Sequence, residues 1–230
     1  ACRAAAMPAV AVADDANLFG AMQFCAAAKK AGVQPIVGAL LALAPIEALP
    51  RTPGRQPAAE PLVFLVKDAQ GYANLLRLMS RAYTEAEPGA EVRVTLEQLE
   101  GHAEGLICLT GGPAGPVNAA LRRGDAKLAR RLLQGLQAAF GDRLYLELVR
   151  HGDPDAEAIE PALLDLAYAL GVALVATNDV HFLEARGHEA HDALICIAEG
   201  VQVAQEERRR VSVEARFKSA AEMQALFADV

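Results

Sequence analysis

The chain has 230 residues, of which 53% are hydrophobic and 22% are charged, and its formal net charge is −7. A chain of this length and apolar content can bury a large core, which argues against an intrinsically disordered protein. The acidic balance argues against a chain that wraps a nucleic-acid backbone by itself, because phosphate binding needs a basic surface.

The sequence contains no signal peptide and no apolar run of the roughly 20 residues that a membrane span needs. Its cysteines are Cys2, Cys25, Cys108 and Cys196, which lie far apart and form no CxxC motif. We interpret them as small buried hydrophobic residues in a reducing cytosol, and we expect a cytoplasmic protein. The chain lacks an initiator Met and resembles a fragment whose front is missing.

Apolar runs and helical patterns alternate along the chain. Strands are predicted at 8–13, 34–45, 61–66, 105–110, 144–149 and 172–177. Helices are predicted at 17–32, 68–83, 95–102, 125–140, 155–171, 187–200 and 219–230. This alternation predicts parallel strands joined by helical crossovers, either in a doubly wound sheet or in a barrel.

Local signals mark the ends of several elements. Asn17 is expected to cap the first helix, and Thr95 and Ser219 each begin a capping box. Pro161 is expected to break its helix or to begin it internally. The segment 46–60 is rich in Pro, Ala and Gly and is predicted to be a surface loop.

Polar side chains follow three of the predicted strands at the point where each strand ends. Asp14 and Asp15 follow the first strand, His151 follows "LYLELV", and Asp179 and His181 follow "VALVAT". Parallel strands place their carboxyl ends on one face, so these residues are expected to converge as ligands for zinc, manganese or iron. The alternatives stay open: the first two aspartates can cap a helix, and the others can be ordinary loop residues.

We expect no functional role for the remaining histidines or for the most basic run of the sequence. His188 and His191, at i and i+3 of a predicted helix, are expected to face solvent, and His102 is assigned no role. Arg208–Arg210 is interpreted as a solvated loop or helix end. The glycines of "GGPAGP" lack the lysine and Ser/Thr of a phosphate-binding loop.

Four segments resemble the N-terminal polymerase-and-histidinol-phosphatase (PHP) domain of the bacterial DNA polymerase III alpha subunit family. They read "AMPAVAVADDANLFGAMQFCAAAKKAGVQPIVGA", "LVKDAQGYANLLRLMSRAY", "LYLELVRHGDP" and "VALVATNDVHFLEARGHEAHDALICIAEG". The resemblance covers residues 1–230 and implies a distorted (β/α)7 PHP-type barrel, incomplete because the first strand is missing. It also implies that 201–230 begins the connection toward a polymerase palm.

The resemblance implies a metal cluster at the strand ends, and this sequence keeps part of it. Positions that match the family pattern are Asp14, His151, Asp179 and His181. Asp15 replaces a histidine and is a possible ligand, whereas Leu40 and Pro61 replace a glutamate and a histidine and cannot ligate. We therefore expect a partial or relic site that holds at most one weakly bound Zn or Mn ion, and no catalytic residues.

The resemblance implies that the full-length parent is a DNA-directed DNA polymerase that replicates DNA with Mg ions in a palm outside this sequence. The fragment itself is expected to be a non-catalytic structural and docking module. Its expected partners are the palm and thumb of the same chain and a proofreading exonuclease subunit, with DNA reached only through the complete polymerase and no membrane contact. The alternatives are a metal-dependent phosphoesterase of the histidinol-phosphatase type and a pure interaction module.

The missing front has an expected physical consequence. A barrel without its first strand exposes two strand edges. The chain as it stands is therefore expected to be less stable than the domain with its N-terminus restored, and comparable urea midpoints for the two would show the expectation to be wrong.

Overall fold

The computed structural model describes residues 1–46, 59–87 and 89–230, so the predicted loop 46–60 lies mostly outside the described residues. The strands are β1 (Ala9–Asp15), β2 (Gln34–Leu43), β3 (Pro61–Val66), β4 (Arg93–Val94), β5 (Leu106–Leu109), β6 (Leu144–Val149) and β7 (Ala173–Thr177). The α-helices are α1 (Ala21–Lys30), α2 (Ala69–Glu85), α3 (Leu96–Glu100), α4 (Pro116–Arg122), α5 (Ala126–Phe140), α6 (Pro154–Leu170), α7 (His188–Glu199) and α8 (Ala220–Leu226). No helix in these described ranges is long and apolar enough to cross a membrane.

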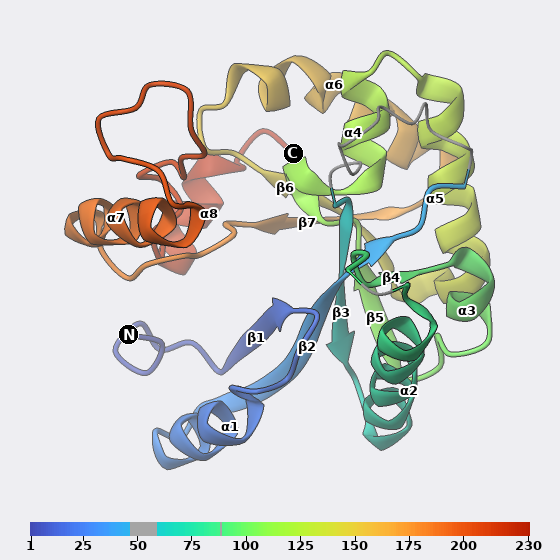
Figure 1. The fold of residues 1–230 in the computed structure, drawn as a ribbon, viewed down its shortest axis with the longest axis horizontal. Helices are drawn as coiled ribbons and strands as arrows, with labels where there is room; N and C mark the ends of the chain where they lie inside the picture. The colour runs from blue at the N-terminus through green and yellow to red at the C-terminus, as the bar shows by residue number, and fades with distance from the viewer. Residues whose placement is uncertain (47–58, 88) are drawn as a thin grey trace.

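The strands form one sheet in the order β1-β2-β3-β5-β6-β7, and the short β4 pairs with β2. Figure 1 shows the sheet curled, with the helices arranged around it. Strands β1 and β7 stand at the two ends of the order and do not pair with each other in the described part of the chain. The molecule is thus an α/β half-barrel, which agrees with the predicted incomplete PHP-type barrel.

One strand corrects the expectation of parallel pairing. β3 runs antiparallel to both β2 and β5, whereas the pairs β1–β2, β5–β6 and β6–β7 are parallel. A parallel return needs a long crossover, usually a helix, and the segment 46–60 has no helical pattern. Because β3 is reversed, its first residue, Pro61, lies opposite Ala42 near the carboxyl end of β2.

The core lies between the sheet and the helices that cover it. The rings of Phe64 on β3 and Phe140 on α5 are 5.9 Å apart at its centre. The sequence places Leu128, Leu132, Leu136 and Phe140 in register on one face of α5, and this prediction is confirmed because all four are buried. Fully buried leucines complete this core, and they include Leu41, Leu62, Leu75, Leu78, Leu99, Leu106, Leu133, Leu144 and Leu146.

Helix α2 turns a different face to the core from the one predicted. The helical spacing within 68–83 predicts that Leu75, Leu76, Met79 and Tyr83 lie on one side. In the structure Leu75, Leu78 and Ala82 are buried, whereas Leu76 and Tyr83 are exposed. Leu75, Leu78 and Ala82 stand at positions i, i+3 and i+7 and form the stripe that faces the core. Leu76 is the next residue after Leu75 and is therefore rotated about 100° around the helix axis from it. The helix was predicted correctly, but its contact face was not.

Helix ends follow the predicted capping residues in two cases and depart from them in one. The capping boxes at Thr95 and Ser219 are both formed. Helix α1 instead begins at Ala21, and Asn17 accepts a hydrogen bond from the amide of Phe19 in the preceding turn. Pro161 lies within α6, which continues past it. The sequence pattern did not predict the short elements β4 and α4.

Close approach of two glycines couples α2 to the turn before β5. A Cβ added to Gly71 would lie 1.8 Å from the carbonyl oxygen of Gly105, so this contact requires a residue without a side chain. We expect Gly71→Ala to lower the free energy of unfolding by about 1–3 kcal/mol, the usual range for overpacking. Urea denaturation followed by circular dichroism measures the change.

The matched control is Gly101→Ala, because a Cβ there would meet nothing nearer than 3.9 Å. We expect its effect to stay within about 0.5 kcal/mol, as for ordinary surface substitutions. Equal effects of the two substitutions would contradict the proposed close approach.

Candidate functional site

A cavity of about 400 Å³ opens where β2, β6 and β7 end and β3 begins. The predicted site residues His151, Asp179 and His181 all line it. Leu40 and Pro61 line the same cavity, on the wall formed by β2 and β3. The reversed direction of β3 explains this arrangement, because it places the start of that strand beside the end of β2. The other lining residues are Val63, Gly111, Gly112, Pro113, Ala114, Glu147, Val149, Asp153, Ala156, Arg209, Arg210, Val211 and Ser212.

The two aspartates at the end of β1 are not among the residues that line this cavity. Asp15 is exposed, although it pairs in register with Leu40. Asp14 lies against the start of α1, since a Cβ on Gly20 would be 3.2 Å from its Oδ2 atom. No side chain caps α1, so the capping alternative for these aspartates is not realised.

Asp179 and His181 interact directly at the mouth of the cavity. Nε2 of His181 lies 3.3 Å from Oδ2 of Asp179. This hydrogen bond lowers the pKa of the Asp179 carboxyl and raises the pKa of the His181 imidazole. Asp179 adopts a left-handed backbone conformation with φ of 37°, which is uncommon for a residue other than glycine. The local backbone therefore needs support from its neighbours.

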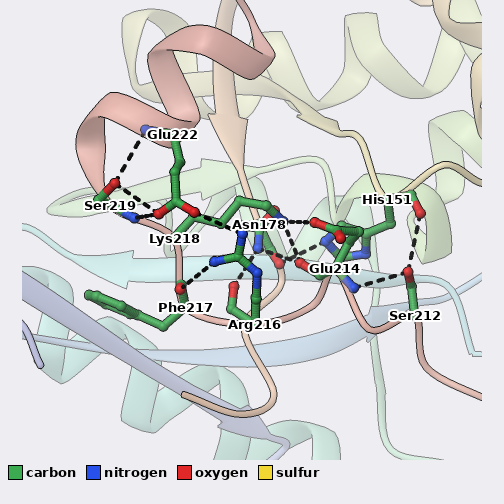
Figure 2. Close-up of polar contacts among 9 residues, drawn as sticks. All are labelled: His151, Asn178, Ser212, Glu214, Arg216, Phe217, Lys218, Ser219 and Glu222. Carbon is green, nitrogen blue, oxygen red and sulfur yellow. Dashed lines mark hydrogen bonds and ion pairs between the residues drawn. The ribbon is translucent and has the colours of Figure 1, made fainter. Parts of the chain in front are cut away.

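Asn178 supplies that support by binding the segment that follows α7 (Figure 2). Its side-chain amide donates to the carbonyl oxygens of Glu214 and Arg216 at 2.8 and 2.7 Å. Its Oδ1 atom accepts a hydrogen bond from Nζ of Lys218 at 3.0 Å. Backbone bonds extend the pairing, because the His181 amide donates to the Ala215 carbonyl. The residue before Asp179 is thus buried and held on several sides.

Lys218 is the cationic partner in this network. Its side chain is 6% exposed and its ammonium lies 3.1 Å from the carboxylate of Glu214. It also donates to the backbone carbonyl of Glu214. A buried ammonium requires such a full set of acceptors, because desolvation of an unpaired charge is strongly unfavourable.

His151 joins the same assembly from the end of β6, as Figure 2 shows. Its Nε2 atom lies 2.9 Å from the carbonyl oxygen of Asn178, and its own carbonyl accepts a hydrogen bond from Oγ of Ser212. His151, Asp179 and His181 are therefore positioned by contacts that involve Asn178 and the segment of residues 212–218. The sequence contained no periodic signal for these contacts, which connect residues 27 to 61 positions apart.

Glu147 is a cavity residue that the sequence analysis did not single out. It lies on β6, is 7% exposed, and accepts a hydrogen bond from the hydroxyl of Thr177 through Oε1. Its Oε2 atom is also buried, beside the backbone amides of Gly111 and Gly112. Burial raises the pKa of this carboxyl, and the nearby charge of Asp179 raises it further, whereas hydrogen bonds from Thr177 and from the backbone of Gly111 and Gly112 oppose the rise. The available signal was a lone glutamate within the otherwise apolar run "LYLELV".

Arg208 and two histidines are less exposed than expected. The Arg208 side chain is almost fully buried in an ion pair with Asp192 at 2.6 Å, whereas Arg209 and Arg210 are exposed as predicted for a solvated loop. His188 and His191 are half-buried rather than solvent-facing. The ring of His191 packs 5.0 Å from that of His181, which places it behind the cavity mouth.

The donor set decides which metal sites the cavity can support. In the described ranges, no group of three or more His, Cys, Asp or Glu side chains is arranged to hold a metal ion. Leu40 and Pro61 present no donor to the cavity, so the residues do not fit a multinuclear cluster. The predicted ligand set of Asp14, His151, Asp179 and His181 stays a prediction.

The role of Lys218 can be tested by removing its charge. We expect Lys218→Met to lower the free energy of unfolding by about 1–3 kcal/mol, because it leaves buried acceptors without a donor. Thermal and urea denaturation measure the effect. The matched control Lys127→Met alters an exposed lysine on α5 and is expected to be nearly neutral. Equal losses of unfolding free energy in Lys218→Met and Lys127→Met would contradict the stabilising role of the Lys218 hydrogen bonds.

The Asp179–His181 pair predicts a pH dependence. Because the folded pKa of His181 is raised, its stabilising contribution is complete below the unfolded value of 6.5 and is lost as pH rises through the folded pKa. The contribution of Asp179 is present above its unfolded value of 3.8 and is lost as pH falls through its lowered pKa. NMR titration should show a lower His181 pKa in Asp179→Asn, but not in Asp165→Asn on the surface of α6. An unchanged His181 pKa in Asp179→Asn would disprove the pairing.

Comparisons with known proteins agree with the geometry of the half-barrel. Residues 1–151 match the PHP domain family model. The chain is 46% identical over 226 residues to DNA polymerase III subunit alpha of Caulobacter vibrioides, covering 98% of this chain and 20% of that protein. It is 38% identical to the Rickettsia prowazekii protein of the same name and 35% identical to that of Escherichia coli, with 97% of this chain covered in each.

This chain spans about a fifth of the length of these curated relatives, 18% of the Rickettsia prowazekii protein and 19% of the Escherichia coli protein. The family match itself extends over more than half of the chain and includes β1 to β6. The half-barrel with its strand-end cavity therefore belongs to the PHP domain family.

Proposed function

We propose that this chain is the PHP portion of a replicative DNA polymerase III alpha subunit and serves there as a structural and docking module. The observation that carries the proposal is alignment with such subunits over 97 to 98% of the chain. The parent would extend DNA by nucleotidyl transfer, using Mg ions in a palm outside this sequence. DNA would be reached only through that complete polymerase.

The cavity supports a module without robust hydrolytic activity. A multinuclear phosphoesterase needs bridging carboxylates and a water activated between two metals. Leu40 and Pro61 occupy the β2–β3 wall of the cavity and offer no side-chain donor. Asp179 is engaged with His181, and His151 is engaged with the carbonyl of Asn178. What remains would hold at most one weakly bound Zn or Mn ion.

We infer the binding partners of this chain from those expected for the full-length polymerase. The palm and thumb of the same chain are the first partners, and a separate proofreading exonuclease is the second. The C-terminal segment is well suited to transmit such contacts, because Arg150 at the end of β6 pairs with Glu160 and with Asp229. The guanidinium also lies 4.8 Å from the ring centre of Phe227, so the cavity region and the chain end are held together.

A second candidate function is a metal-dependent phosphoesterase of the histidinol-phosphatase type. The observation that favours it is the retained Asp179–His181 pair at the cavity mouth, beside His151. An Asp and two His are donors that Zn or Mn accept.

Assays of the purified chain decide between the two functions. We expect no turnover of p-nitrophenyl phosphate, histidinol phosphate or single-stranded DNA above the blank with Mn²⁺ or Zn²⁺ added. Binding of two or more ions per chain, with turnover lost in Asp179→Ala, would establish the phosphoesterase and overturn the structural module. A heat-denatured sample and an EDTA-treated sample serve as controls.

The docking role has its own measurement. We expect the chain to co-elute from a size-exclusion column with the proofreading exonuclease subunit of the same organism, and not with an unrelated exonuclease of similar size. Separate elution at micromolar concentrations would remove the exonuclease as a partner and leave only the scaffold role.

A further inference from the structure

A surface groove lies where the helices α4, α5 and α6 meet. Helix α4 packs against both α5 and α6, and Figure 1 shows the three helices together. The groove encloses about 450 Å³ and shares no lining residue with the cavity at the strand ends. We call it the α5–α6 groove. It is thus a separate feature of the surface, which neither the strand-end cavity nor the Asn178 network explains.

The floor of the α5–α6 groove is apolar. Leu121 on α4 and Leu166 on α6 form the less exposed part of its lining, whereas Ala126, Ala162 and Ala169 are exposed. The distance at which a second helix can pack depends on the side chains at the contact, so these alanines allow a partner to approach closely. Exposed apolar surface edged by polar residues is typical of a protein-binding site.

Two cations edge the groove on the side of α5. Lys127 and Arg130 both line it and are exposed, and they stand three positions apart, so they lie on the same side of the helix. Among the described residues, neither side chain takes part in an ion pair or a side-chain hydrogen bond. Asp165 on α6 contributes one negative charge to the lining. The fold therefore leaves the two cations on α5 available to a partner.

The neighbouring sequence is strongly basic, although the chain as a whole has a net charge of −7. Its one acidic residue, Asp125, caps α5 and accepts a hydrogen bond from the amide of Leu128. Positive charge gathered on one face of an acidic protein favours a partner of negative charge there. The basic residues between positions 121 and 131 are Arg122, Arg123, Lys127, Arg130 and Arg131.

The apolar floor favours an acidic protein segment over a nucleic acid. A phosphate backbone has no apolar side chains with which to cover Leu121 and Leu166, and a chain with a net charge of −7 repels a polyanion at longer range. An amphipathic helix, in contrast, buries its apolar stripe in such a groove. Its charged side chains then lie beside the edge of the groove.

We propose that the α5–α6 groove binds an acidic amphipathic helix of a partner protein. The apolar stripe of that helix covers Leu121 and Leu166, and its carboxylates pair with Lys127 and Arg130. The inference rests on the proposed docking role and gives that role a place in the fold.

Fluorescence anisotropy of the full 230-residue chain with a synthetic helix tests the proposal. The fluorescein-labelled helix carries a leucine stripe flanked by glutamates. We expect saturable binding that weakens as salt is added. The double substitution Lys127→Glu/Arg130→Glu should weaken it at least about tenfold, because like charges then face each other. Ala162→Gln places a polar side chain in the groove without altering its charge and should also weaken binding.

The matched control is Lys29→Glu/Lys30→Glu, which makes the same charge change on the exposed surface of α1 and should bind the helix like the unaltered chain. Circular dichroism spectra confirm that each variant is folded. Absence of binding, equal binding by Lys127→Glu/Arg130→Glu, or equal binding of a synthetic helix with lysines in place of its glutamates would overturn the proposal.

Two further results would also overturn it by assigning the groove to another occupant. One is tighter binding of a duplex DNA oligonucleotide than of the acidic helix, lost in Lys127→Glu/Arg130→Glu. The other is self-association of the chain in analytical ultracentrifugation, lost in the same double substitution. The proposed function is judged separately, because exonuclease co-elution does not depend on the synthetic helix.

Discussion

The Asn178 side chain is the contact on which the cavity depends. It uses its amide hydrogens and its oxygen to hold the segment from Glu214 to Lys218, and each of these bonds is made away from bulk water. Hydrogen bonds in such surroundings are difficult to replace, since a broken one leaves a desolvated group behind. The next residue, Asp179, is consequently kept in a left-handed conformation that an isolated chain would rarely adopt.

This constraint links the cavity to the end of the chain. The segment held by Asn178 continues into α8, whose first turn is capped by Ser219 and Glu222. Arg216 pairs with the same glutamate at 2.7 Å, so the capping box and the Asn178 network share one short stretch of backbone. A displacement of α8 in a larger assembly would therefore also move the backbone beside Asp179. Such a connection suits a domain whose proposed task is to support its neighbours.

The cavity walls combine apolar residues with polar groups that already have partners within the protein. Leu40 and Pro61 contribute apolar surface where a hydrolase would need donors, and His151 is bonded to a backbone carbonyl. Protein groups thus satisfy most of the polar atoms that a metal cluster would otherwise organise.

Sequence patterns predicted the elements well where one physical signal dominated. The strand "LYLELV" follows from an apolar run that only Glu147 interrupts, and the face of α5 from Leu128 to Phe140 follows from regular apolar spacing. The capping boxes predicted at Thr95 and Ser219 are both formed. Prediction failed where several weak signals competed. The face of α2 depends on which stripe meets the sheet, and the start of α1 depends on a turn through Asn17 and Phe19.

The sequence by itself determined the family and placed His151, Asp179 and His181 at strand ends, because apolar strands followed by polar residues are local patterns. The tertiary structure alone decided that these three meet Leu40 and Pro61 in one cavity, since that requires the reversal of β3. It also decided that Asp14 points toward α1 and that Glu147 is buried at the cavity wall, where it accepts a hydrogen bond from Thr177. Contacts between residues far apart in the chain are set by packing of the whole sheet, and no local pattern encodes them.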